Sequence, residues 1–328
     1  MIESVAEIFV RLGGRLSRLT EADDVVVRAC AANGWFMPAE VVRALHAVAD
    51  DMLGRQMLMQ WMRRYPQLPA GTQRNVLVVM AGNIPAVGFS DLLCVVMSGC
   101  RCLVKPSSKD RVLMEYIVSQ LLDICPQLPL EMYDNQRVDA VIATGSDNAC
   151  RYFRAMYGGI PSLLRGSRSS VAVLSEADCC SGTAAAALAD DIFAYSGLGC
   201  RNVSLVFVPR GCRLPLAEPA VLNPKYMNNY RRERAVAAMR GEEFVDTGFA
   251  VVTPGYEFPP ELSRITCAEY DSTSQVTDWL DRHDDEIQCV VTDWLDHPRR
   301  AGLGRAQHPS LTDYPDGRDV MAFLASIS

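Results

Sequence analysis

The sequence predicts an α/β protein of two domains, in which a parallel sheet carries helices on both faces. The chain has 328 residues, and at about 150 residues per domain this length fits two domains. From residue 75 onward, short apolar runs suited to buried strands alternate with amphipathic segments. Apolar residues make up 49% of the chain and charged residues 22%, which is typical of a globular protein and excludes wholesale disorder.

Residues 1–70 are expected to be helical, because apolar residues recur there at helical spacing, and a loop with Pro66 and Pro69-Ala-Gly71 follows. The expected strands of the first half are 75–80, 101–104, 140–143 and 171–174, with helices over 86–97, 110–124 and 148–157 between them. The second half is expected to contain helix 183–195, strand 203–208, helix 228–240, strands 249–252 and 265–268, helix 274–284 and strand 287–291. Residues 302–314 have no regular pattern, and 320–324 form a short apolar end.

Charge and composition exclude several functional classes. The 32 Lys and Arg residues against 39 Asp and Glu give a net charge of −7, whereas nucleic-acid binding usually needs a basic face. Uninterrupted apolar stretches such as 92–97 are far shorter than the roughly 18 residues of a membrane helix. The N-terminus has no basic region before an apolar core, so we expect no signal peptide and a cytoplasmic protein.

The twelve cysteines are scattered through apolar segments, without a CxxC pair and without a zinc pattern shared with the four histidines. This distribution favours a reducing compartment, mostly structural cysteines and no metal site.

Cys200 is the exception that we single out. It follows the glycine turn Gly197-Leu-Gly199 between a helix and a strand, where glycine permits positive φ and close approach of a ligand. The neighbouring Arg201 would favour the thiolate if its side chain points the same way; the alternative is that Cys200 is structural.

Polar residues follow three successive strands of the first half. Asn83 follows the first, in a position to donate to an oxyanion, although a simple turn explains it equally. Lys105 closes the second strand, where it could donate to ribose hydroxyls or be only a solvated charge. Gly145 and Ser146 close the third strand and open a helix, which suits a pyrophosphate or an ordinary N-cap. Ligands of open α/β sheets bind at such strand ends. GxGxxG, GxSxG, P-loop and HExxH motifs are absent from the sequence.

The chain resembles the aldehyde dehydrogenase superfamily, and more narrowly its acyl-CoA reductase (LuxC-type) branch, in an ordered set of segments. The resemblance is clear over about residues 75–210, returns in 302–324 and is weak elsewhere. The segments are GNIPAVGFSDLLCVVMSGCRCLVKPSSKD, IATGS, LLRGSRSSVAVL, GLGCRNVSLVFVP and GLGRAQHPSLTDYPDGRDVMAFL.

This resemblance implies the two-domain aldehyde dehydrogenase architecture. The expected boundaries are a cofactor-binding domain with a helical N-terminal segment over 1–175 and a catalytic domain carrying the thiol over 176–300. Residues 301–328 form a tail that packs back or makes an oligomer contact.

The resemblance also implies roles for individual residues. Cys200 matches the nucleophile, and Asn83 matches the oxyanion-hole amide, partnered by the backbone N–H of Cys200. The cofactor would be held by Lys105 at the ribose, by Ser107 and Ser108, by Gly145 and Ser146 at the pyrophosphate, and by Gly166. Ser108 stands where many NAD-dependent members have a ribose-binding Glu, which favours NADPH, with NADH as the alternative. Glu261 is a candidate for the glutamate that holds the nicotinamide ribose.

The activity that follows is NADPH-dependent reduction of an acyl thioester, on CoA or on a protein, to an aldehyde through an S-acyl-cysteine. Members that hydrolyse their thioester carry a Glu in the stretch that matches Leu163–Gly166, where this chain has no carboxylate, so water attack would be poorly assisted. Three alternatives stay open: a hydrolysing aldehyde dehydrogenase, an acyl-accepting protein that hands its acyl group to a partner, and an aldehyde-dehydrogenase-like protein with a degenerate cofactor site. The resemblance further implies an acyl-activating partner enzyme and a homo-oligomer.

Overall fold

A five-stranded parallel sheet forms the centre of the first part of the chain in the computed structural model, which describes residues 2–68 and 74–327. The strand order is β3-β2-β1-β4-β5, and Val76 of the central strand lies opposite both Cys102 and Ala140. The strands are β1 (Asn75–Val79), β2 (Arg101–Lys105), β3 (Leu130–Met132), β4 (Ala140–Thr144) and β5 (Ser162–Arg165).

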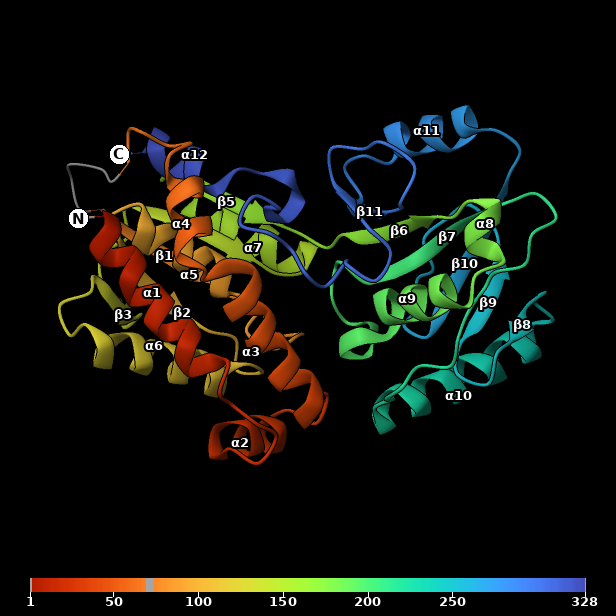
Figure 1. Ribbon diagram of the computed structural model, residues 1–328, viewed down its shortest axis with the longest axis horizontal. Coiled ribbons are helices and arrows are strands. Elements are labelled where there is room, and N and C mark those ends of the chain that lie inside the picture. Colours follow the sequence, from red (N-terminus) through yellow and green to blue (C-terminus); the bar gives the residue numbers. More distant parts are fainter. Residues whose placement is uncertain (1, 69–73, 328) are drawn as a thin grey trace. The chain divides into compact units, whose positions relative to one another are not determined.

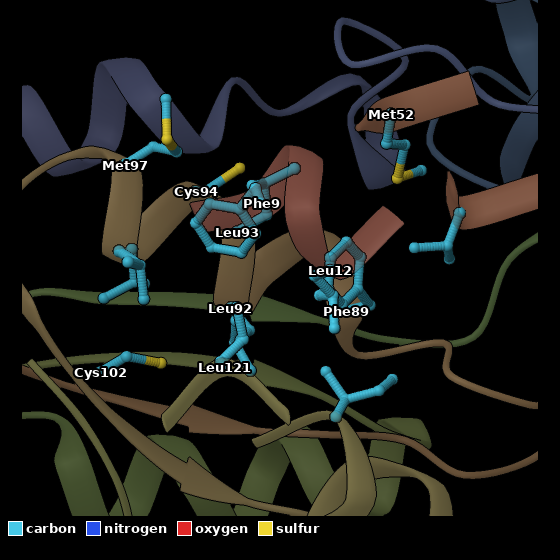
Figure 2. Packing of buried hydrophobic residues seen from close by; sticks show 14 of the residues in the cluster. Phe9, Leu12, Met52, Phe89, Leu92, Leu93, Cys94, Met97, Cys102 and Leu121 are labelled. Carbon is cyan, nitrogen blue, oxygen red and sulfur yellow. The ribbon is translucent and has the colours of Figure 1, made fainter. Parts of the chain in front are cut away.

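Side chains alternate between the two faces of this sheet and build two separate cores. Val76, Val78 and Val104 join a large cluster with the helices of one face, whose packing is shown in Figure 2. Leu77 and Leu103 point to the opposite face, where α7 covers them with Phe153 and Tyr157. The helices of this part are α1 (Ile2–Leu16), α2 (Asp24–Ala32), α3 (Pro38–Met52), α4 (Arg55–Met62), α5 (Phe89–Met97), α6 (Arg111–Ile124), α7 (Asp147–Tyr157) and α12 (Val320–Ser326).

A second sheet of seven strands forms the centre of the rest of the chain, in the order β12-β11-β6-β7-β10-β9-β8. All neighbours are parallel except β8, which is antiparallel to β9 at the edge. The α11 helix lies on one face of this sheet, and α9 and α10 lie on the other (Figure 1). The strands are β6 (Ser169–Val173), β7 (Val203–Pro209), β8 (Val245–Asp246), β9 (Val251–Pro254), β10 (Arg264–Tyr270), β11 (Ile287–Val291) and β12 (Arg300–Ala301).

The helices of this second part begin at side chains that cap them. Ser175 and Asp178 form a reciprocal capping box, and Ser181 and Asn223 each accept a backbone N–H of the helix that follows. These helices are α8 (Glu176–Cys179), α9 (Gly182–Phe193), α10 (Pro224–Arg240) and α11 (Thr273–Arg282), with a short 3₁₀ turn at Ala194–Gly197.

The chain divides into two compact units, and their boundaries differ from the expected ones. Unit 1 comprises residues 1–167 and 309–328, and unit 2 comprises 168–308. The strand expected at 171–174 was assigned to the cofactor domain, but β6 pairs with β7 and β11 in the sheet of unit 2. The expected tail is also divided, because residues up to His308 belong to unit 2 and those from Pro309 belong to unit 1.

Most expected elements are present, with differences at their ends. The helix expected from Ala86 begins at Phe89, because Ala86 has a left-handed backbone with φ 54°. Strands β3 and β5 were not foreseen, and the loop expected at 69–71 falls outside the described residues. All twelve cysteines are present as thiols. Among residues 2–68 and 74–327, no helix combines the length and hydrophobicity that crossing a bilayer requires.

Candidate active site

The residues predicted to hold a cofactor lie together at one edge of the unit 1 sheet. Asn83 lies four residues beyond β1, Lys105 is the last residue of β2, and Ser146 lies two residues beyond β4. Because these strands are parallel neighbours, their carboxyl ends share one edge. Strand order reverses about β1 and β4, and ligands of doubly wound sheets bind at that position.

The loops after β1 and β2 approach each other closely at Gly82. A Cβ on Gly82 would lie 2.6 Å from the Cβ of Ser107 and 3.2 Å from that of Asp110, so a larger residue would push the loops apart. Ser107 is half-buried between the loops, whereas Ser108 is exposed. Lys105 is exposed, and its Nζ lies 5.5 Å from the centre of the Tyr133 ring.

Asp110 is buried behind this loop pair and was not predicted as a functional residue. Only 2% of its surface is exposed, and neither carboxylate oxygen has hydrogen-bond geometry with another described residue. Burial raises the pKa of the Asp110 carboxyl well above its usual value, and the nearby backbone N–H of Ala86 offsets this only in part. A buried acid therefore lies directly beneath the loop that carries Asn83.

The loops after β4 and β5 are joined by hydrogen bonds around Gly145 and Gly166. The Gly145 N–H donates to the Arg165 carbonyl at 3.1 Å, and the Ser167 N–H donates to Asp147 Oδ1 at 3.0 Å. A Cβ on Gly166 would lie 2.3 Å from that same carboxylate oxygen. Ser146 caps α7 by accepting the Ala149 N–H at 3.3 Å, so the N-cap interpretation holds whether or not Ser146 also contacts a ligand.

The stretch Leu163–Gly166, which lacks a carboxylate of its own, receives one from a distant part of the chain. Arg165 donates through Nη2 to the carboxylate of Asp91 in the first turn of α5, and both side chains are buried. Asp91 Oδ1 and Arg165 Nε and Nη1 have no hydrogen-bond partner among the described residues. Both charged groups are thus withdrawn from solvent and face each other.

Cys200 lies in unit 2, in a half-buried turn between the 3₁₀ turn and β7. Before it, Tyr195, Ser196 and Gly197 have left-handed backbones with φ of 53°, 59° and 69°. The expected positive φ is therefore found at Gly197, and two buried non-glycine residues share it. A left-handed conformation costs a non-glycine residue about 1–2 kcal/mol, so the surrounding structure must hold this turn in place.

Two buried side chains hold the turn. Asn202 Oδ1 accepts the Gly199 N–H at 2.7 Å, and Asn202 Nδ2 lies 3.2, 3.1 and 2.9 Å from three carbonyl oxygens, those of Asp191, Ile192 and Ala194. Ser170 Oγ, from β6, donates to the Cys200 carbonyl at 2.9 Å. The backbone that carries the thiol is thus tied both to the end of α9 and to the sheet.

The segment 302–308 returns to this turn through Asp191. Its buried carboxylate accepts the backbone N–H groups of Gly304 at 2.6 Å and Ala306 at 2.9 Å. Arg201 Nε donates to the Ala306 carbonyl at 2.5 Å, so the Arg201 side chain is directed to this returning segment. Hydrogen bonding to the backbone therefore accounts for the position of Arg201 without any role at the thiol.

Glu261 lies on an exposed loop of unit 2 and forms an ion pair with Arg232, 3.3 Å from Nη2 to Oε2. The next residue, Leu262, contacts the nucleophile turn, since its Cδ1 would lie 3.3 Å from a Cβ on Gly197. Glu261 is thus on a loop that reaches the turn. A cavity of about 240 Å³ in unit 2 is lined by residues 253–260 with Arg264 and Thr266, and none of the predicted site residues lines it.

The structure therefore groups the predicted residues in two places: the cofactor candidates and Asn83 in unit 1, and Cys200 in unit 2. It adds residues that the sequence interpretation missed. Asp191 carried a weak signal, because it is one of two adjacent acids in an Ala-rich helix and a charged residue on a buried helix face usually has partners. Asn202 carried one through its position, two residues after the candidate nucleophile. Ser170 and Asp110 carried no signal in the sequence.

Comparison with known proteins gives one family match and one curated relative. The profile of the family described as acyl-CoA reductase (LuxC) matches residues 16–233. A long-chain acyl-protein thioester reductase of Aliivibrio fischeri is 25% identical over 237 residues, which is 63% of this chain and 49% of that protein. The chain thus spans about half the length of this curated relative.

Solved aldehyde dehydrogenases share the fold. Aldehyde dehydrogenase 21 of Physcomitrella patens, solved with the reaction product succinate, has a TM-score of 0.69 at 11% identity, and the match covers 100% of this chain and 84% of that one. The indole-3-acetaldehyde dehydrogenase of P. syringae, solved as a point mutant with NAD+, has a TM-score of 0.64 at 14% identity, and the match covers 94% of this chain and 75% of that one. The expected aldehyde-dehydrogenase-like α/β fold is confirmed.

Proposed function

Because the chain belongs to the acyl-CoA reductase (LuxC) family, we propose that it reduces an acyl thioester to an aldehyde while Cys200 carries the acyl group. The observation that carries this proposal is the half-buried Cys200 thiol, held on a left-handed turn that buried polar side chains fix in place. Strained conformations of this kind are concentrated at functional sites. The thioester would be an acyl-CoA or an acyl-protein, delivered by an acyl-activating partner.

In the proposed reaction, the Cys200 thiolate attacks the thioester carbonyl. A new C–S bond forms to Cys200, the bond to the leaving thiol breaks, and that thiol departs with a proton. The backbone N–H of Cys200 would donate to the oxyanion that develops on the carbonyl oxygen, and the resemblance to aldehyde dehydrogenases assigns a second donor to the amide of Asn83. One such donor typically contributes about 3 kcal/mol to lowering the barrier.

A nicotinamide nucleotide fits the residues at the strand ends of unit 1. Gly82, Gly145 and Gly166 leave these loops closely packed where a Cβ would collide. Lys105 and Ser108 are exposed at the end of β2, and the N-terminus of α7, the positive end of its dipole, starts beside Ser146. When bound, the reduced nucleotide supplies a hydride to the acyl carbon. The Cys200 sulfur then leaves as the aldehyde forms, so that acyl-CoA, NADPH and a proton give aldehyde, CoA and NADP+.

Two features support reduction over hydrolysis and NADPH over NADH. The Asp91 carboxylate near Leu163–Gly166 is buried against Arg165, so it is not exposed to an attacking water molecule. Ser108 presents a hydroxyl where a Glu would repel a 2′-phosphate, and Lys105 lies close to it in sequence with its side chain in solvent. These features favour a phosphorylated ribose electrostatically.

The test is a reductase assay with acyl-CoA of several chain lengths and NADPH or NADH. We expect loss of reduced-nucleotide absorbance with an equal amount of aldehyde, trapped as its hydrazone. Cys200→Ser should abolish the reaction, whereas Cys180→Ser, which removes an exposed thiol elsewhere in unit 2, should preserve it. Consumption of neither nucleotide with any acyl chain would contradict the proposal.

The same assay distinguishes the proposed reductase from an acyl-accepting protein and from a hydrolysing aldehyde dehydrogenase. An acyl-accepting protein would form an acyl-Cys200 species, seen as a mass increase, that reduced nucleotide does not discharge. A hydrolysing aldehyde dehydrogenase would reduce NAD+ with an aldehyde in the absence of CoA.

A further inference from the structure

The peptide group between Gly199 and Cys200 is fixed from both sides by buried side chains. On one side, the Gly199 N–H donates to Asn202 Oδ1 at 2.7 Å. On the other, the Cys200 carbonyl accepts from Ser170 Oγ at 2.9 Å. The Cys200 N–H lies between these two anchors along the chain, so its direction is set by them.

Asn202 is chemically suited to its position because it must both accept and donate. Its Nδ2 is within 3.2 Å of three backbone carbonyl oxygens at the end of α9 and the start of the turn, and its Oδ1 faces a backbone N–H. Rotating the amide by 180° would set an oxygen against three oxygens, so the orientation is unambiguous. A carboxylate has no N–H for these carbonyls, and an apolar residue would leave them and the Gly199 N–H without this partner.

The left-handed turn needs these hydrogen bonds of Asn202, because its backbone conformation is strained. Tyr195 and Ser196 are buried with φ near 55°, and the carbonyls that Asn202 binds precede them while the N–H that it binds follows them. One side chain therefore spans the strained segment from end to end.

Ser170 gives an independent anchor on the sheet. It is fully buried in β6 and accepts the Cys289 N–H of β11 at 3.2 Å while donating to Cys200. Its hydroxyl thus connects the nucleophile turn to two neighbouring strands.

We propose that Asn202 is a positioning residue, which holds the Cys200 N–H in the direction that an oxyanion on the acylating thioester requires, with Ser170 as its support on the sheet. This inference rests on the proposed function, since it concerns the acyl transfer to Cys200. In this proposal, the strained turn orients a hydrogen-bond donor, the Cys200 N–H. The nucleophilic thiol is the side chain of Cys200 itself.

The experiment compares two reactions of Cys200 in the full-length protein. Acyl transfer from decanoyl-CoA is followed by intact mass. Alkylation by iodoacetamide, a reaction that needs no oxyanion donor, is followed by the mass of the Cys200 peptide. For Asn202→Ala we expect acyl transfer to fall at least tenfold while alkylation changes less than threefold across pH 6 to 9. Asn75→Ala, which removes another amide-to-carbonyl hydrogen bond at the amino end of β1, should leave both rates unchanged.

Each result decides for or against the positioning role. An equal fall of both rates, or no fall in acyl transfer, would overturn it. If Asn202→Ala does not fold, Ser170→Ala takes its place, with acyl transfer expected to fall at least threefold at unchanged alkylation and an unchanged transfer rate overturning the inference. Failure of the proposed function gives a different result, because the wild-type protein would then not take up an acyl group on Cys200 at all.

Discussion

In unit 1 the candidate residues lie on loops that follow four separate strands, whereas in unit 2 the candidate nucleophile lies on one turn that buried side chains hold from several directions. Lys105, Ser108 and Ser146 are exposed at their strand ends. Asn202, Ser170 and Asp191 are buried, and their partners are backbone groups around Cys200 or in the segment that returns to it.

Substitutions should therefore have different consequences in the two units. An exposed side chain at a strand end contributes little to folding, so its replacement should change binding or chemistry while stability is preserved. A buried polar side chain that satisfies several backbone groups contributes both to stability and to the geometry of the site, because its loss leaves those groups without partners.

The largest effect is expected for Asn83→Ala. Loss of one oxyanion donor should lower the acyl-transfer rate by about 100-fold, which corresponds to roughly 3 kcal/mol. Because Asn83 is half-buried on a loop, its replacement should lower the free energy of unfolding less than replacement of a fully buried polar residue of unit 2. Single-turnover acylation and urea denaturation measure the two quantities. A fall in rate below threefold would remove Asn83 from the proposed site, and a large loss of stability would break the contrast between the units.

Asp191→Ala should have the largest effect on stability. It leaves the buried N–H groups of Gly304 and Ala306 without their acceptor, at a cost of about 2 kcal/mol. We expect an earlier unfolding transition of unit 2 and faster hydrogen exchange in the peptide covering 302–308. Asp281→Ala, at an exposed site on α11, is the matched control and should change neither. Unchanged exchange in 302–308 would show that the carboxylate does not hold this segment.

The sequence predicted the strand-end residues of unit 1 well, because their positions follow from local patterns. Buried apolar runs identify β1, β2 and β4, and the rule that parallel strands share a carboxyl edge brings Asn83, Lys105 and Ser146 together. The pattern of buried apolar runs did not predict the short strands. Strand β3 has three residues and β5 has four, and both lie at the sheet edges with partly exposed positions.

The supports of the unit 2 turn could not be predicted, because each depends on where the folded chain returns. Asn202 acts through carbonyls eight to eleven residues earlier, and Asp191 acts through N–H groups more than a hundred residues later. The ion pair of Asp91 with Arg165 joins residues 74 positions apart. No periodicity or motif in the sequence indicates contacts over such sequence separations. The position of Cys200 after its glycine turn, in contrast, is evident from six consecutive residues.

A smaller effect, confined to the exposed edge of unit 1, is expected for Ser108→Glu. The new carboxylate should repel a 2′-phosphate and raise KM for NADPH by about tenfold, equivalent to 1.4 kcal/mol, with little change for NADH. High salt should weaken the effect, since exposed charges are screened. Ser119→Glu adds the same charge at an exposed site on α6 and should leave both KM values unchanged. Equal changes for the two nucleotides would place Ser108 away from the 2′ position.

A pH-dependent effect, absent near pH 4, is expected for Asp110, the buried acid of unit 1, whose surroundings differ from those of Asp191. Asp191 accepts two backbone N–H groups, whereas Asp110 has no hydrogen-bond partner among the described residues, and burial raises the pKa of its carboxyl. An unfolded Asp has a pKa of about 3.9, so above that pH the native state binds more protons than the unfolded state. The free energy of unfolding must then fall as pH rises from about 4.

Asp110→Asn removes this titration while keeping the shape of the side chain. We expect equal stability of the variant and the wild type near pH 4, and a more stable variant at pH 7, by about 1.4 kcal/mol for each unit by which the pKa is raised. Urea denaturation at several pH values measures the difference. Asp134→Asn, at an exposed position after β3, should give a curve parallel to the wild type. If the Asp110→Asn curve is also parallel, Asp110 is charged and partnered in solution, and the loop that carries Asn83 then rests on a carboxylate held as firmly as Asp191.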